Sequence, residues 1–409
     1  MTERRRFTLR GGPELEDRLH DAEATLAARL GEALDPDEHD GVLMIGGYGR
    51  GEGGVERRDG QEHPHNNLDL LVLVEEPPGR TEEIRQRATA AVQPVVEEIG
   101  IGIDVGAIAV SALRRAPCHV MWHDMRLGHR VVLGPAKVLG DLEHLTADRL
   151  LTSDVLTLLV NRGTLILIND LLLAQGEPDE HGRRTVIKHA VKAIIGYGDA
   201  LLHSLDRYHW SYAEKQRRMA AATEIPEDFR ATYDEAAEFR FEPSYERFAG
   251  RDLAAWMDEL RTQVQPLHLR FESWRLGETL ESWEGYAERA ARSALLGEID
   301  GPKALARRVW RFTRSDPAPS GSLGFKLGFR AAGERGRLAF LFPAASYAPA
   351  DAPGYLAQAR EALGVSGDDP DDLRRSYLAR WSSAGDLNSG PVLQALGLSP
   401  DRDAEGADS

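Results

Sequence analysis

The fold is decided by the run Val42-Leu43-Met44-Ile45-Gly46-Gly47-Tyr48-Gly49-Arg50-Gly51-Glu52 and by the later run Asn66-Asn67-Leu68-Asp69-Leu70-Leu71-Val72-Leu73. The apolar residues 42–45 end in glycines, a pattern typical of a buried strand that runs directly into a turn. Residues 68–74 form a second apolar run, which predicts a neighbouring strand. A glycine pair after a strand allows backbone N–H groups to approach a phosphate, since no Cβ stands in the way.

Acidic residues follow the glycines at positions that a sheet can bring together. Side chains alternate along a strand, so Asn67 and Asp69 are expected on one face. A third strand is predicted over residues 101–110, and Asp104 lies within it. Carboxylates beside a phosphate-binding turn can hold Mg²⁺. The combination favours metal-dependent phosphoryl or nucleotidyl transfer.

Other interpretations of the glycines explain less of the sequence. A dinucleotide-binding fingerprint fitted to Gly49, Gly51 and Gly54 should open a helix, but residues 55–60 are polar and suit a hairpin that turns at Asp59-Gly60. A Walker loop requires a lysine that is missing here. A plain glycine-rich connection between two strands remains possible, but it accounts for neither Arg50-Gly51-Glu52 nor the returning Asp69.

At these residues the chain resembles the DNA polymerase β-like nucleotidyltransferase superfamily. It is most similar to the branch with Gly-Gly-Tyr-Gly-Arg-Gly-Glu followed by Asp-x-Asp, as in the uridylyltransferases of nitrogen regulation. The resemblance covers roughly residues 40–135, and continues weakly through Trp122-His123-Asp124 and residues 130–134. Residues 192–202, with Gly198-Asp199-Ala200-Leu201-Leu202, look like the helical domains appended to such transferases.

The resemblance implies a role for each matching residue. Gly46 and Gly47, with Tyr48 in the same segment, would bind the phosphates of a nucleoside triphosphate such as ATP. Arg50 and Glu52 would brace the loop or touch phosphate. The implied metal ligands are Asp69, Asp104 and Asn67, with Mg²⁺ or alternatively Mn²⁺ as the cation. Asp104 would also help to deprotonate the acceptor hydroxyl.

One residue departs from the family pattern, because Asn67 stands where the family has the first Asp. An amide oxygen can still coordinate Mg²⁺, but one negative charge is lost. Asp59 or Glu62 could compensate by folding back, or His63 and His65 could supply ligands for Mn²⁺ or Zn²⁺. The alternative to a transferase is therefore a catalytically weakened or inactive protein that binds nucleotide or has a regulatory role. A third hypothesis is a helical scaffold with a vestigial α/β part.

The helical region offers further candidates. Lys188 and Lys192 share a helix face, with Asp199 two turns on, and either lysine could neutralise pyrophosphate. We favour Lys192 as a catalytic residue and assign Lys188 and Asp199 to nucleotide binding. The alternative is a solvated helix face. Three aromatic residues could stack on a base or an aromatic acceptor, or could simply be core: Tyr208, Trp210 and Tyr212.

The hydrophobic pattern predicts an α+β fold, with a small mixed sheet followed by mostly helical domains. We expect a nucleotidyltransferase-like domain at 1–140, a helical domain closing the cleft at 141–276, a second helical region at 277–398 and a disordered acidic tail at 399–409. Helices are predicted over residues 13–34, 80–99, 119–127, 150–174, 185–205, 226–238 and 251–276, and a short strand over 130–133.

Composition restricts the partners and the compartment. The 409 residues carry 66 acidic and 50 basic side chains, a formal charge of -16, so nucleic acid is an unfavourable partner. Cys118 is the single cysteine, which excludes an internal disulfide framework and indicates a cytoplasmic protein. The most apolar stretch, 155–174, is interrupted by polar residues, so no membrane span is expected. The sequence leaves open whether the acceptor is a small-molecule hydroxyl or a protein side chain. It also leaves open the base preference and the oligomeric state.

Overall fold

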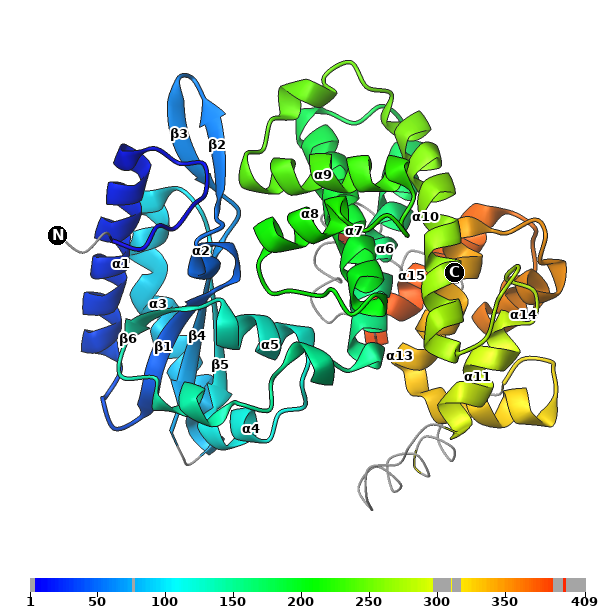
Figure 1. Cartoon of the computed structure of the whole chain (residues 1–409), viewed down its shortest axis with the longest axis horizontal. Coiled ribbons are helices and arrows are strands. Elements are labelled where there is room, and N and C mark those ends of the chain that lie inside the picture. Colours follow the sequence, from blue (N-terminus) through cyan, green and yellow to red (C-terminus); the bar gives the residue numbers. More distant parts are fainter. Residues whose placement is uncertain (1–3, 76–77, 297–309, 311–317, 385–392, 395–409) are drawn as a thin grey trace, which may run out of the picture. The chain divides into compact units, whose positions relative to one another are not determined.

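The computed structural model describes residues 4–75, 78–296, 310, 318–384 and 393–394. The fold is α+β, with a small mixed sheet near the N-terminus followed by helices, as the sequence predicts (Figure 1). The described residues form two compact units: unit 1 lies within Met1–Val155 and Leu205–Ala249, and unit 2 lies within Leu156–Ser204 and Gly250–Ser409.

This division differs from the predicted boundaries at 140 and 276. Residues 205–249 were expected in a helical domain with 141–204, but they belong to the α/β unit. The described part of 277–398 shares a unit with 156–204 and 250–276 instead of forming a region of its own. The reason is packing. In unit 1, helix α9 (Glu227–Phe241) contacts strand β2 (Gly54–Arg58). In unit 2, helix α13 (Leu323–Tyr347) contacts three others: α10 (Leu253–Leu276), α11 (Tyr286–Leu296) and α15 (Pro370–Ala384). The predicted tail at 399–409 lies outside the described residues.

Unit 1 is built on a sheet of four strands: β1 (His39–Ile45), β4 (Leu68–Val74), β5 (Ile103–Ala109) and β6 (Arg130–Leu133). Their order in the sheet is β5-β4-β1-β6. Strand β4 runs parallel to β5, whereas β1 runs antiparallel to both of its neighbours. The predicted small mixed sheet is therefore confirmed.

One face of this sheet is covered by two long helices, α1 (Pro13–Ala33) and α3 (Thr81–Ile99) (Figure 1). The apolar positions that predicted α1 are all buried: Leu15, Leu19, Ala22, Leu26 and Leu30. They pack against the even-numbered residues of β4, such as Leu70 and Val72. Burying one such leucine stabilises the fold by about 1.5–3 kcal/mol.

The odd-numbered residues of β4 point to the opposite face. Leu71 and Leu73 share a core with Met125 and Tyr208, beneath α4 (Val110–Arg114) and α5 (Val120–Leu127). Because side chains alternate along a strand, Asp69 also belongs to this face. The remaining elements of unit 1 are η1 (Pro78–Arg80), η2 (Lys137–Asp141), η3 (Ala147–Arg149), α8 (Tyr212–Ala220), α9 (Glu227–Phe241) and η4 (Tyr245–Phe248).

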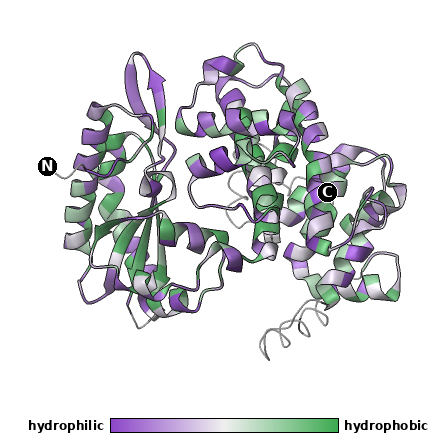
Figure 2. Cartoon of the chain, in the orientation of Figure 1, coloured by the Kyte–Doolittle hydropathy of each residue, from purple (hydrophilic) through white to green (hydrophobic). Residues whose placement is uncertain are grey.

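The polar run after the glycines forms the predicted hairpin. Strands β2 (Gly54–Arg58) and β3 (Gln61–His65) pair antiparallel, and Asp59 and Gly60 form the turn between them with φ of 54° and 75°. Positive φ at both central residues is the geometry that favours Asp-Gly in a two-residue hairpin turn. The hairpin is mostly hydrophilic, in contrast to the sheet strands (Figure 2).

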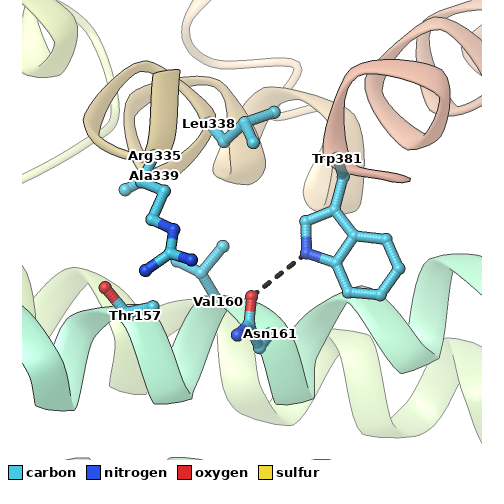
Figure 3. A pocket seen from close by; sticks show the side chains of 7 residues that line it. All are labelled: Thr157, Val160, Asn161, Arg335, Leu338, Ala339 and Trp381. Carbon is cyan, nitrogen blue, oxygen red and sulfur yellow. Dashed lines mark hydrogen bonds between the residues drawn. The ribbon is translucent and has the colours of Figure 1, made fainter. Parts of the chain in front are cut away.

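Unit 2 is helical throughout its described part. Its helices are α6 (Thr152–Ala174, in this unit from Leu156), α7 (Glu180–Ser204), α10 (Leu253–Leu276), α11 (Tyr286–Leu296), α13 (Leu323–Tyr347), α14 (Pro353–Leu363) and α15 (Pro370–Ala384). Among the described residues, α6 alone is long and apolar enough to cross a membrane, but 61% of its most apolar window is buried, as in a core helix. A niche of only about 10 Å³ lies between α6, α13 and α15, where the Trp381 indole donates to Asn161 (Figure 3).

Candidate functional site

The glycine segment that follows β1 forms a single helical turn, α2 (Gly46–Arg50). Gly46 has φ +68°, a conformation that residues with a side chain rarely adopt, and a Cβ at this position would overlap the Asp69 carboxylate. Gly47 is less restricted, because a Cβ there would meet the Glu52 carbonyl oxygen at 3.4 Å. Gly46 is therefore what permits the turn to lie directly against Asp69.

The structure brings Asp69, Asp104 and Asn67 together at one edge of the sheet, the end at which β4 and β5 begin. Asp69 pairs with Ile45 of β1 on one side and with Asp104 of β5 on the other. Residues opposite each other on neighbouring strands share a face, so both carboxylates project from the same side of the sheet. The Asn67 Nδ2 donates to Asp104 Oδ2 at 2.9 Å. Asn67 and Asp104 are exposed and Asp69 is half-buried, so the edge is open to solvent.

The donor set at this edge consists of oxygen atoms. Two carboxylates and an amide oxygen are ligands that suit Mg²⁺ or Mn²⁺. The Asn67 Oδ1 lies beside Gly102, where a Cβ would be only 2.9 Å away, so the backbone leaves room for this oxygen. The edge itself has only two carboxylates. Across the described residues there is no group of three or more His, Cys, Asp or Glu side chains that could hold a metal.

Among the described residues, those suggested as substitutes for the missing acid do not lie with Asp69 and Asp104 in a metal-binding group. Glu62 accepts the Gly12 N–H at 2.6 Å and pairs with Arg57 at 3.0 Å, and the Gly12 hydrogen bond helps to lower its pKa. His65 contacts the Tyr245 hydroxyl at 3.0 Å through Nε2. Asp59 lies in the hairpin turn, and His63 pairs with Glu56 on β2. Within the described part of the chain, none of them joins Asp69 and Asp104 in a metal-binding group.

Arg50 and Glu52 brace the glycine turn from behind. The Arg50 side chain is 8% exposed and lies 3.6 Å from Glu52, 3.9 Å from Asp124 and 4.9 Å from the Tyr212 ring centre. Burial by itself lowers the pKa of Arg50, but Tyr212, Asp124 and Glu52 outweigh it, so the net direction is upward and the charge is kept.

Glu52 caps helix α8, whose first residue, Tyr212, lies 160 positions later in the chain. Its carboxylate accepts hydrogen bonds from the Ser211 hydroxyl at 2.5 Å and from the backbone N–H groups of Tyr212 at 2.9 Å and Ala213 at 3.2 Å. Ser211 is itself the N-cap of α8. A carboxylate on the first N–H groups of a helix satisfies orphan donors and complements the helix dipole. The contact holds the glycine turn to α8.

The Tyr48 side chain has a structural role instead of the predicted nucleotide contact. It is 2% exposed, and its hydroxyl accepts the His65 N–H at 2.8 Å and donates to the Gly54 carbonyl at 2.9 Å. Burial raises the pKa of this phenol. Any contact between Tyr48 and a nucleotide would therefore come from its main chain.

Sequence reasoning missed a cluster of buried charges behind the turn. Lys215 is fully buried, with its Nζ 4.1 Å from the Tyr208 ring centre and 4.4 Å from that of Tyr212. The Tyr208 hydroxyl donates to Asp124, 3.1 Å from either carboxylate oxygen. Tyr208 and Tyr212 are thus engaged with protein groups. No local signal predicts this cluster, because its members come from α5 and from residues 208–215.

Lys188, Lys192 and Asp199 lie on α7, in unit 2. Lys192 is exposed and Asp199 is buried. The site described above is built from unit 1 alone, and the roles suggested for these three residues stay predictions.

Comparison of the chain with protein-family models, with curated proteins and with solved structures finds no match. The resemblance to nucleotidyltransferases therefore rests on the motif residues, and the case for a function rests on the geometry of unit 1.

Proposed function

We propose that this protein is a metal-dependent nucleotidyltransferase that moves a nucleoside monophosphate from a nucleoside triphosphate such as ATP to an acceptor hydroxyl. One observation carries the proposal: Asp69 and Asp104 face the same side of the sheet in register, and Asp69 lies against Gly46. Two carboxylates beside a glycine turn are the arrangement needed to hold a cation next to phosphate.

In this proposal Asp69, Asp104 and the Asn67 oxygen hold Mg²⁺, or Mn²⁺, which would neutralise phosphate charge. Gly46 and Gly47 allow the phosphates close to the backbone. The acceptor oxygen attacks the α-phosphorus, the bond between that phosphorus and the bridging oxygen to the β-phosphate breaks, and pyrophosphate leaves. Asp104 takes the proton of the acceptor hydroxyl.

The acceptor is a small-molecule hydroxyl or a protein side chain, since the charge of -16 disfavours nucleic acid. We also propose a cytoplasmic location. It rests on the single cysteine, Cys118, which is buried and donates to the Thr146 carbonyl at 3.3 Å.

A second candidate is a nucleotide-binding or regulatory protein without turnover. The observation in its favour is that Asn67, at the position of the first Asp in the family pattern, directs an N–H donor at Asp104. The edge then carries two negative charges instead of three. Coulomb attraction for a dication falls accordingly, by several kcal/mol in a partly dehydrated site.

The test is a thermal-shift panel of four nucleoside triphosphates with Mg²⁺ or Mn²⁺, followed by mass analysis for a transferred nucleotide. Ligand at 100 times its Kd stabilises the native state by about 2.7 kcal/mol, which a melting curve resolves. Asp69→Ala should remove the metal-dependent shift and reduce transfer by about 100-fold or more. Asp37→Ala, an exposed aspartate of unit 1, is the matched control.

Asn67→Asp separates the two candidates. If the wild-type protein consumes nucleoside triphosphate, it is a transferase. If it binds nucleotide without turnover and Asn67→Asp creates activity, the regulatory candidate holds. If neither protein is stabilised by any nucleotide, both fail and a scaffold role remains.

A further inference from the structure

A second site is indicated by a cavity of about 310 Å³ in unit 1, lined by residues of α5, by residues 145–147 and 208–210, and by Arg218 of α8. Its volume is at the lower end of the range for small-molecule sites, about 300–1,000 Å³. None of its ten lining residues is Asp or Glu, although the chain holds 66 acidic side chains. An acid-free cavity in so acidic a protein is suited to an anion.

One wall of the cavity is aromatic. His209 and Trp210 stack with ring centres 5.4 Å apart and planes inclined by 30°. The indole packs on the backbone at Gly128, where a Cβ would lie 2.7 Å from it. Leu127 and Leu145 add apolar surface. A fixed indole face beside leucines favours a planar ring.

The cavity also offers donors. Arg126 donates one Nη1 hydrogen bond to the Leu145 carbonyl at 3.2 Å and makes no ion pair with any carboxylate in the described part of the chain. Arg218, in contrast, is paired with Glu214 at 2.7 Å. Arg126 thus brings a positive charge that the protein itself does not neutralise, and a guanidinium binds carboxylate or phosphate in a forked geometry.

His209 contributes a neutral donor. Its Nδ1 accepts the Ser211 N–H at 3.1 Å, so the proton of the neutral ring lies on Nε2. Burial and the neighbouring Arg218 lower the pKa of His209, which keeps the ring neutral at pH 7.

The cavity is linked to the glycine turn. Tyr208, one of its lining residues, donates to Asp124, and Asp124 contacts Arg50 at the end of α2. Tyr208 belongs to the core with Leu71, on the face of the sheet from which Asp69 projects. Tyr208 therefore joins the cavity to the core on the Asp69 face of the sheet.

We propose that this cavity binds a small planar molecule that carries a carboxylate or phosphate group, with the ring on Trp210 and the anion on Arg126. Resting on the proposed transferase function, we assign this molecule as the acceptor of the nucleotide.

The test compares three probes in titrations followed by NMR: 4-hydroxybenzoate, 4-hydroxybenzyl alcohol, which lacks the charge, and lactate, which lacks the ring. The indole N–H signal of Trp210 is assigned from a Trp210→Phe variant. We expect 4-hydroxybenzoate to shift that signal saturably and to bind at least tenfold more tightly than either analogue. Arg126→Gln should weaken 4-hydroxybenzoate about tenfold, because a charge-assisted hydrogen bond is lost. Arg115→Gln, an exposed arginine outside the cavity, should change nothing.

Equal binding of the charged and neutral rings, or a Trp210 signal that never moves, would overturn the proposal. The two proposals fail separately. Aromatic-anion binding that survives in Asp69→Ala, with no nucleotide transfer in the wild type, removes the transferase function and leaves an anion site. Transfer to an acceptor whose KM is the same in Arg126→Gln and the wild type removes the acceptor assignment and leaves the transferase.

Discussion

The polar side chains buried in unit 2 differ from those at the sheet edge and cavity of unit 1. In unit 2 several polar groups are buried and bonded to one another: His189 donates through Nδ1 to Asn169 at 2.9 Å, and His268 contacts the Tyr347 hydroxyl at 3.0 Å. In unit 1, Asn67 and Asp104 are exposed at the sheet edge, and Arg126 lines an open cavity. The cavities differ in the same way, about 310 Å³ in unit 1 against about 10 Å³ for the niche in unit 2.

This difference indicates which polar side chains are available to bind a ligand. A buried polar group that already has its partners contributes to stability and specificity, and it has no bonding capacity left for a ligand. Polar groups gathered at an open edge are stabilised by water until a ligand replaces it. Stability should therefore respond most to changes in buried networks such as those of unit 2, and ligand binding to changes at the open sheet edge and cavity of unit 1.

The largest expected effect on stability comes from the buried ion-pair network of unit 2. Asp170, 8% exposed, pairs with Arg261 and lies 3.7 Å from Arg374. Arg261→Ala leaves this carboxylate with one distant partner, and we expect a loss of about 3 kcal/mol in unfolding free energy. Urea denaturation measures it. Glu259→Ala, which removes a surface ion pair between the same helix and Arg251, should cost less than about 0.5 kcal/mol. Similar costs for the two variants would contradict the comparison.

The second effect is a loss of stability in acid. Burial lowers the pKa of both His189 and His268 to about 3. Between about pH 6.5 and pH 3 the unfolded state binds protons that the folded state does not, so stability falls as the pH falls through this window. Each histidine should cost about 2 kcal/mol between pH 7 and pH 5.

The measurement is the unfolding free energy at pH 7 and at pH 5. His189→Gln should make the decrease smaller by about 2 kcal/mol. His181→Gln, an exposed position on the same helix, should leave it as in the wild type. A decrease that is identical in all three proteins would show that His189 is protonated in the folded state.

The third effect tests the glycine turn of unit 1. Gly46→Ala forces a side chain into the positive φ region and against Asp69, at a cost of about 1–2 kcal/mol. Because Asp69 must move, metal-dependent nucleotide binding should fall at least tenfold. Gly47→Ala meets only a 3.4 Å contact and should fall much less. Calorimetric titration compares the two, and equal losses would argue against a special role for Gly46.

The smallest effect concerns the cap of α8. Glu52→Gln keeps the shape but replaces one acceptor oxygen with a donor that faces N–H groups, and we expect a loss of about 1 kcal/mol. Melting curves compare it with Glu143→Gln, an exposed position of unit 1 that should stay within about 0.3 kcal/mol of the wild type. An unchanged melting temperature in Glu52→Gln would mean that the cap does not stabilise unit 1.

Much of the local structure could be predicted from the sequence. Helical spacing of apolar residues predicted α1 within a residue of its bounds, and Asp59-Gly60 predicted the β2–β3 turn. Alternation along a strand placed Asn67 and Asp69 on one face, and the pairing of β4 with β5 aligned Asp69 with Asp104. The helical spacing, the turn and the strand alternation depend on neighbours only a few residues apart, whereas the alignment of Asp69 with Asp104 depends on the pairing of β4 with β5.

The sequence by itself therefore determined the elements, their faces and the residue types at the sheet edge. Only the tertiary structure decided that residues 205–249 join the α/β unit, that Glu52 caps α8, and that Arg126 and Trp210 line one cavity. These features unite residues that are far apart in the chain, up to 228 positions in the Arg10–Glu238 hydrogen bond. Periodicity records which side of an element is apolar, but the partner of that side is fixed by the packing of the whole unit.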